Sequence, residues 1–129
     1  MVFKLIIFMP RKQGTSKEDF ISYYENNHVP LMKQISEEVG ATATNPIAYK
    51  RHYTHLDSNG AAQDHGPLFP APDFHYDAVT ECAYNSKEEA FAWHEKVYGD
   101  GRLKADEAKF VDQERMRVVN VEERDGGLD

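Results

Sequence analysis

Residues 23–31 have the sequence YYENNHVPL and mark the end of a predicted helix over 15–27. Pro30 disfavours helical backbone at Val29, because the proline ring crowds the residue before it. The helix is therefore expected to end or kink at Val29. His28 then lies in the last helical turn, directly before the break.

This helix carries one apolar stripe. Its members fall at spacings of one, three or four residues, which define one face of a helix: Phe20, Ile21, Tyr24, His28 and Leu31. The dipole at the helix C-terminus favours a charged imidazole at His28 and burial disfavours it, so the ring could exchange a proton near neutral pH. A histidine on an apolar face is more commonly a packed side chain with one hydrogen bond. Both roles stay open.

The composition excludes several classes of function. The chain has 129 residues, 40% of them apolar and 29% charged, which fits one domain over 1–121 and a frayed, charged tail over 122–129. The net charge of −7 argues against nucleic acid or an anionic membrane as a partner. No apolar run approaches the length of a membrane span. The single Cys82 allows no internal disulfide, so a reducing, cytoplasmic compartment is expected.

Capping boxes mark two helix starts. In this motif a hydroxyl caps an early amide and a glutamate reaches back to the cap. Thr15 and Glu18 fit it at the first helix, and Ser86 and Glu89 fit it at a later one. The later helix should turn its apolar face, which includes Trp93, toward the core.

The order of elements predicts the fold class. Four segments have the apolar runs or the alternation of strands, and helices are expected between them: strands over 2–9, 46–56, 77–84 and 115–121, helices over 15–27, 31–39 and 102–111 and from Ser86. No internal repeat or linker stands out. This β-α-β-β-α-(α)-β order predicts an α+β fold with a ferredoxin-like split β-α-β antiparallel sheet. The first strand is apolar on both faces, so a second copy is expected to cover the open face, giving a dimeric α+β barrel.

One predicted strand has an unusual face. Tyr49, Arg51 and Tyr53 alternate along it and therefore share one side of the sheet. Two tyrosines and an arginine can hold a planar, anionic or phenolic ligand by stacking and forked hydrogen bonds. The same face can equally be solvated or part of an interface, and both interpretations stay open.

Residues 57–75 form a long predicted loop with several glycines and prolines. Loops of this length are commonly functional or disordered, and apolar anchors such as Phe69 predict a partly ordered lid. The loop region also holds histidines and aspartates that metals bind, namely His55, His65, His75, Asp57, Asp64 and Asp73. Their spacing matches no zinc pattern, so no metal site is expected.

The chain resembles the EthD family of the dimeric α+β barrel superfamily. The resemblance rests on an opening strand and four stretches: GTSKEDF at 14–20, YYENNHVPL at 23–31, YDAVTE at 76–81 and DEAKFVD at 106–112. It spans nearly the whole chain apart from the 57–75 loop. The resemblance implies a cofactor-independent protein with a cavity between its sheet and its helices.

The resemblance to the EthD family also implies a class of reaction. Fungal relatives include decarboxylases and dehydratase-like enzymes of aromatic polyketide pathways, whereas bacterial namesakes are tied to ether degradation without clear chemistry of their own. We therefore expect a lyase that uses no cofactor and acts on an aromatic polyketide-like acid by decarboxylation or dehydration. The expected partners are a small aromatic molecule and a second copy of the chain.

Each candidate site residue has an expected role in that reaction. His28 is expected to act as general acid or base, and Asp112 either orients His28 or caps the turn before the last strand. Arg51 would orient a carboxylate or phenolate. Asp106 is expected to be a structural or surface charge. The full set of expected substrate-binding residues is Tyr24, Tyr49, Arg51, Glu81, Trp93 and His94.

Two other functions stay open, because a fold does not fix a reaction. The first is a cofactor-free oxygenase of anthrone-type phenols, in which the substrate carbanion itself reduces oxygen. The second is a non-enzymatic dimeric binder of small hydrophobic compounds. Release of carbon dioxide would mark the lyase and uptake of oxygen would mark the oxygenase, whereas a binder would leave its ligand unchanged.

Overall fold

The computed structural model describes residues 2–55 and 74–128. Within them the strands form a four-stranded sheet in the order β2-β3-β1-β4, with every neighbouring pair antiparallel. The strand bounds are β1 Phe3–Met9, β2 Ala48–Tyr53, β3 Ala78–Tyr84 and β4 Arg117–Val121. The lid predicted over 57–75 lies almost entirely outside the described residues.

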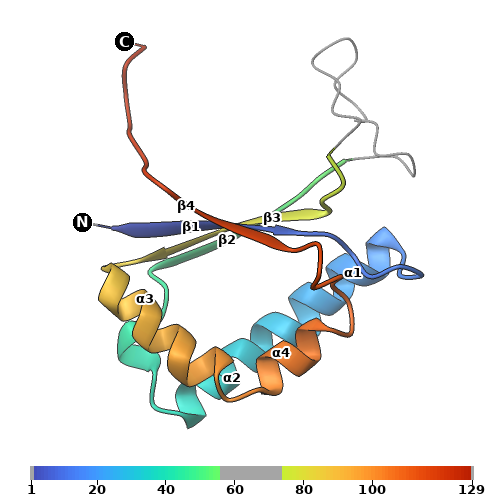
Figure 1. Ribbon diagram of the computed structural model, residues 1–129, viewed down its shortest axis with the longest axis horizontal. Coiled ribbons are helices and arrows are strands. Elements are labelled where there is room, and N and C mark those ends of the chain that lie inside the picture. Colours follow the sequence, from blue (N-terminus) through green and yellow to red (C-terminus); the bar gives the residue numbers. More distant parts are fainter. Residues whose placement is uncertain (1, 56–73, 129) are drawn as a thin grey trace.

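The helices form a single layer against one face of this sheet (Figure 1). Their bounds are α1 Lys17–Tyr23, α2 Val29–Glu38, α3 Lys87–Trp93 and α4 Arg102–Glu107, with a 3₁₀ turn at Thr42–Thr44. The α1–α2 segment connects β1 to β2, and β3 lies between these two strands. This is the split β-α-β arrangement, so the predicted ferredoxin-like α+β fold is confirmed. No helix of the described residues is both long and apolar enough to cross a membrane.

The first helix begins one residue later than predicted. Ser16, not Thr15, is the N-cap: its extended backbone places its hydroxyl to accept from the Asp19 amide at 3.1 Å. The Thr15 amide instead donates to the carbonyl of Lys12 in the preceding turn. The predicted cap at Ser86 is confirmed, since its hydroxyl accepts from the Glu89 amide at 3.1 Å.

The helix does not end before Pro30, so of the two expectations for Val29, an end or a kink, the end is wrong. A π-helical turn, Tyr24–His28, follows α1 directly and leads into α2, and Val29 keeps helical dihedrals of φ −62° and ψ −48°. In this wider turn the Val29 amide donates to the carbonyl of Tyr24. Such π turns are frequent at functional sites. A second π turn, His94–Tyr98, follows α3 in the same way.

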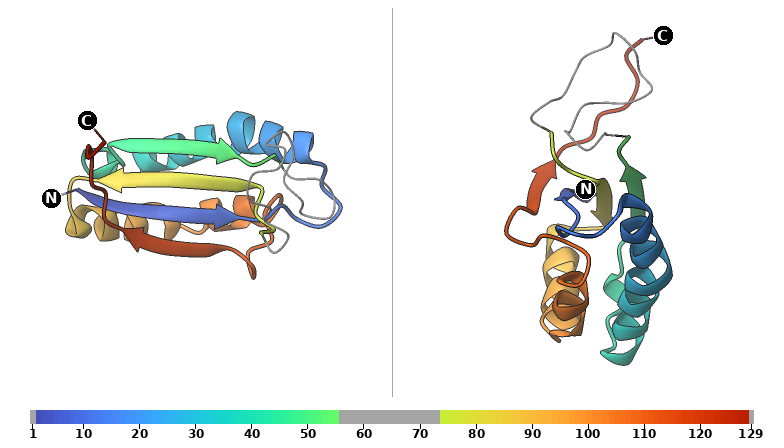
Figure 2. Two further views of the ribbon diagram at one scale, coloured as in Figure 1. Left: turned by 90° about the horizontal axis from the view of Figure 1, so that it is seen from above. Right: turned by 90° about the vertical axis from the view of Figure 1, so that its right-hand side faces the viewer.

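The two faces of the sheet differ. The inner face packs on the helices and gives the core side chains such as Leu5 and Cys82. The outer face carries Ile6, Phe8, Val79 and Val119 by strand alternation, and no described helix covers it (Figures 1 and 2). Residues 122–128 carry no helix or strand and leave the sheet on that open side.

Candidate active site

A cavity of about 440 Å³ lies between the inner face of the sheet and the helices. Strand residues such as Leu5, Ile7 and Cys82 form one wall, and helical residues such as Met32, Ala90 and Leu103 form the other. Most of the lining is apolar. The polar or titratable side chains that border it are Tyr24, His28, Tyr49, Cys82, Tyr84, Trp93, His94, Tyr98 and Glu107.

His28 borders this cavity from the first π turn and is only 3% exposed. Its Nδ1 lies 3.0 Å from Oδ2 of Asp106, a residue of α4 that is 7% exposed. An ionised carboxylate can only accept, so the hydrogen bond places the Nδ1 proton on the histidine. Among the described residues no hydrogen bond reaches Nε2. That nitrogen is therefore the one left to exchange a proton with a ligand.

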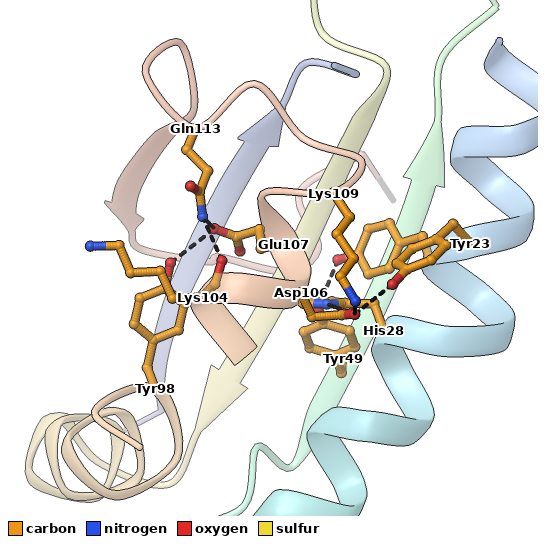
Figure 3. Close-up of polar contacts among 10 residues, drawn as sticks. Tyr23, His28, Tyr49, Tyr98, Lys104, Asp106, Glu107, Lys109 and Gln113 are labelled. Carbon is orange, nitrogen blue, oxygen red and sulfur yellow. Dashed lines mark hydrogen bonds and ion pairs between the residues drawn. The ribbon is translucent and has the colours of Figure 1, made fainter. Parts of the chain in front are cut away.

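Asp106 is held from two sides besides His28 (Figure 3). The Tyr23 hydroxyl donates to Oδ1 at 2.5 Å, and the Lys109 ammonium lies 3.7 Å from the same oxygen. Burial and the hydrogen bond to Asp106 raise the pKa of Tyr23 to about 12, so its phenol stays protonated at neutral pH. The three side chains form a Tyr23–Asp106–His28 chain that fixes the orientation of the imidazole.

The structure gives the orienting role to Asp106 and not to Asp112. The Asp112 carboxylate pairs with Arg115 at 3.4 Å, and the Asp112 amide donates to the carbonyl of Pro10 at 3.0 Å. These contacts belong to the turn before β4, which is the alternative expected for Asp112. Asp106, expected to be structural or at the surface, is the residue that contacts His28.

Tyr24 and Tyr49, both expected to bind substrate, border the cavity and contact each other. Their hydroxyls lie 2.7 Å apart, and that of Tyr24 is also 3.0 Å from the Thr80 hydroxyl. Burial raises the pKa of Tyr24 to about 12 and raises that of Tyr49 well above its ordinary value. The two phenols are thus neutral hydrogen-bonding groups at physiological pH.

Trp93 and His94 also border the cavity, where they were predicted to bind substrate. The indole N–H of Trp93 donates to the side-chain oxygen of Asn45 at 2.9 Å, which fixes the plane of the ring. His94 stacks on the ring of Tyr98, with centroids 4.8 Å apart and planes at 19°. Tyr98 itself donates to Glu107 Oε1 at 2.9 Å, and Gln113 donates to the same oxygen at 3.0 Å.

Two predicted binding residues lie away from the cavity lining. Arg51 makes a bidentate pair with Glu25, at 2.9 Å from Nε and 2.6 Å from Nη2. These hydrogen bonds lower the pKa of Glu25, and they occupy the fork that was expected to hold a ligand anion. Glu81 lies on the outer face of the sheet, where it pairs with Lys4 at 3.4 Å and His52 at 2.7 Å.

Within the described residues no group of three or more His, Cys, Asp or Glu side chains could hold a metal ion. Of the six residues named for a metal site, four lie outside the described ranges and only His55 and His75 lie within them. The residues that border the cavity include acid–base groups, such as His28 and Glu107, and aromatic rings, such as Trp93.

The fold and this cavity define a small α+β protein in which helices and sheet enclose an apolar pocket with a buried histidine–carboxylate pair. A family model, described as the EthD domain, matches residues 12–114. The chain belongs to the EthD family, and the resemblance found in the sequence is confirmed.

Solved structures support the fold. The chain is similar to an ethyl tert-butyl ether d (EthD) family protein from Bacillus halodurans C-125, with a TM-score of 0.62, 18% identity and coverage of 96% of this chain and 100% of the other. An EthD-like protein from Ralstonia eutropha JMP134 has a TM-score of 0.55, 18% identity and coverage of 93% and 87%. An Arabidopsis thaliana protein has a TM-score of 0.55, 15% identity and coverage of 98% and 99%. No curated protein matches the chain.

Proposed function

We propose that the protein is a cofactor-independent lyase that decarboxylates or dehydrates an aromatic, polyketide-like acid. The observation that carries the proposal is the His28–Asp106 pair at the edge of an apolar cavity of about 440 Å³. A buried histidine whose Nδ1 is held by a carboxylate presents Nε2 as a positioned general acid or base. The family membership is compatible with this chemistry but does not determine it.

In the decarboxylation of an ortho-hydroxyaryl acid, Nε2–H of a protonated His28 gives its proton to the ring carbon that bears the carboxylate. The carbon–carbon bond then breaks, its electron pair restores the aromatic ring, and carbon dioxide leaves. The histidine recovers a proton from water. In a dehydration the neutral Nε2 would instead take a proton from carbon, and the resulting Nε2–H would give that proton to the hydroxyl group that breaks from the neighbouring carbon, which leaves as water.

The apolar lining supports the proposal, since a carboxylate loses its charge as carbon dioxide forms. An apolar site therefore disfavours the ground state more than the charge-dispersed transition state. A cationic clamp on the carboxylate would have the opposite effect and hold the ground state. Arg51, the expected clamp, is committed to Glu25, which is consistent with a site that does not grip the leaving group.

His28→Asn tests the proposal, because it keeps a polar side chain of similar size and removes proton transfer. We expect the rate on a hydroxynaphthoic acid or a related hydroxyaryl acid to fall on the order of 10²–10⁴-fold. The melting temperature should change little, because the substitution makes no large cavity. The pH–rate profile of the variant should also lack one limb that the profile of the wild type has.

Near-normal turnover in His28→Asn with a strongly lowered melting temperature would make His28 a core residue and contradict the proposal. Uptake of oxygen by the wild type, without carbon dioxide release, would indicate the anthrone-type oxygenase instead. Binding of aromatic acids without any product would indicate a non-enzymatic binder.

We also propose that the protein is a homodimer in which two sheets pack through their outer faces. The outer face carries apolar side chains such as Phe8 and Val119, which favour association when exposed together. Charged groups surround them, including the Lys4–Glu81 pair. Sedimentation at micromolar concentration is expected to give about twice the chain mass of 14.8 kDa, and a stable monomer would contradict the dimer.

A further inference from the structure

Two consecutive carboxylates of α4 point to opposite sides of the helix (Figure 3). Asp106 turns toward His28 in the first π turn, and Glu107 turns toward Tyr98 in the second. His28 and Glu107 both border the cavity. The helical wall of the apolar cavity therefore has two carboxylate-based polar groups, one on each side of α4, and the proposed reaction uses only the one that contains His28.

The hydrogen bonds of Glu107 are distributed unevenly between its two oxygens. Tyr98 donates to Oε1 at 2.9 Å and Gln113 donates to Oε1 at 3.0 Å. Across residues 2–55 and 74–128 no donor reaches Oε2, although Glu107 is only 6% exposed. A buried carboxylate oxygen without a donor is costly, because it has left water without a replacement partner. A donor on a bound ligand would supply that partner.

We propose that Glu107 is a specificity-determining residue that binds a hydroxyl group of the ligand through Oε2. The inference rests on the proposed function for the identity of the ligand as an aromatic acid, and it adds a hydroxyl at the end of the ligand away from His28. The carboxylate of the ligand would then be kept from Glu107 by like charge and would face His28. The ligand class is a hydroxylated polycyclic aromatic acid in which hydroxyl and carboxyl groups lie at separate ends.

The surroundings of Glu107 favour a neutral hydroxyl over a cation. Besides Tyr98 and its stacking partner His94, the cavity lining includes apolar residues such as Leu103, Met116 and Val118, and an ammonium group would lose its hydration in this cavity with only one carboxylate in return. A phenol or alcohol needs a single acceptor and leaves the rest of its ring system in apolar contact. Oε2 provides that one acceptor.

The test compares 2-naphthol with its O-methyl ether, 2-methoxynaphthalene, by isothermal titration calorimetry. The two probes share a ring system, and only the first has a hydroxyl to donate. Because a hydrogen bond to a charged group is strong, the wild type is expected to prefer the naphthol by roughly tenfold or more. Neither probe carries a carboxylate, so binding is measured without turnover.

Glu107→Gln is the decisive variant. The amide oxygen can still accept from Tyr98 and Gln113, which turns the amide N–H₂ toward the cavity and replaces the acceptor by a donor. The preference for naphthol is then expected to disappear. Glu88 is an exposed carboxylate on α3, so Glu88→Gln is the matched control and should keep the preference.

Tyr98→Phe gives a second, independent measurement, since it leaves Glu107 in place and removes one of its two internal donors. The naphthol preference is expected to stay or to rise. Equal binding of both probes by the wild type, absence of binding by either, or an unchanged preference in a folded Glu107→Gln would each overturn the inference. Turnover of an aromatic acid, whether it is found or not, tests only the proposed reaction. The naphthol preference tests only the role of Glu107, so the two proposals fail separately.

Discussion

The two helical segments that cover the sheet have the same construction and end in different chemistry. Each begins at a capping serine, runs for seven residues as α1 or α3, and widens into a five-residue π turn. Aligning Ser16 with Ser86 places His28 at the position of Tyr98. Both side chains border the cavity, and they donate to or contact neighbouring carboxylates of α4.

The difference between the two segments separates the effect of the π turn from the effect of the side chain that it carries. The backbone device only directs the last side chain of the turn toward the cavity and α4. In the first turn that side chain is an imidazole, which can exchange protons near neutral pH. In the second it is the phenol of Tyr98, whose pKa is raised by burial and by Glu107, so it stays a fixed donor.

The two turns also end differently. Val29 follows the first turn, whereas Gly99 follows the second. A Cβ built on Gly99 would lie 2.1 Å from the carbonyl oxygen of Glu95, a distance at which the backbone must move. The second turn therefore depends on a glycine, and the first does not.

Gly99→Ala is expected to have the largest effect on stability. Because the clash is with backbone, the second π turn must rearrange, and we expect a loss of about 3 kcal/mol in the free energy of unfolding, measured by urea denaturation. Gly40→Ala is the control: its φ of +70° strains an alanine, but its Cβ would meet nothing within 4 Å. That variant should lose only about 1 kcal/mol. Equal losses in the two variants would show that the contact with the Glu95 carbonyl costs nothing and that the second turn does not depend on Gly99.

Tyr23→Phe is expected to have a smaller effect, which is on activity and not on stability. Tyr23 touches neither the cavity nor Nε2; it positions Asp106, which in turn holds His28. Loss of a hydrogen bond worth about 1.4 kcal/mol in the transition state corresponds to about tenfold in kcat. KM should stay unchanged, because the ligand contacts remain. Tyr76→Phe is the control. The ring of Tyr76 packs on Phe8 of the outer face, so this variant should leave kcat unchanged.

Alkaline pH is expected to have the smallest effect. Burial raises the pKa of both Tyr23 and Tyr24 from 10.0 to about 12. Between these values the unfolded chain has lost protons that the folded chain keeps, so stability falls as pH rises through the window. Below pH 10 the contribution is fully present. Melting temperatures from pH 9 to about 12 should show the fall, and Tyr24→Phe should make it shallower; an identical slope would mean that Tyr24 titrates normally.

The fold was predictable because hydrophobic periodicity and element order survive in the sequence. The alternation in β2 and the apolar run of β1 place their strands correctly to within a few residues. The capping rule selected Ser86 correctly but chose Thr15 over Ser16, because Thr15 has a glutamate three residues later whereas Ser16 has Asp19 there. The turn in which the Thr15 amide donates to the Lys12 carbonyl makes Ser16 the cap.

The site was predictable only in part. His28 belongs to a stripe that the helical period reveals, whereas its partner Asp106 is brought near by tertiary packing of α4, which no local pattern encodes. Glu81 was expected to bind substrate but lies on the outer face of the sheet, because alternation in a strand does not tell which of its two faces lines a cavity. Tyr98 and Glu107 were missed.

One signal in the sequence could have found Tyr98. The stretches SKED at 16–19 and SKEE at 86–89 match. When these two stretches are aligned, His28 and Tyr98 occupy the same position, twelve residues after the serine. The match is too short to be taken for a repeat on its own. It gains meaning once both copies are seen to end in the same kind of π turn.

The position of Trp93 has a practical consequence. The chain contains a single tryptophan, and its indole borders the cavity while a hydrogen bond to Asn45 holds it still. Tryptophan emission, excited at wavelengths that the seven tyrosines barely absorb, therefore comes from one fixed emitter in the wall of the pocket. A ligand that enters changes the polarity around that emitter, so the protein reports its own occupancy without a label.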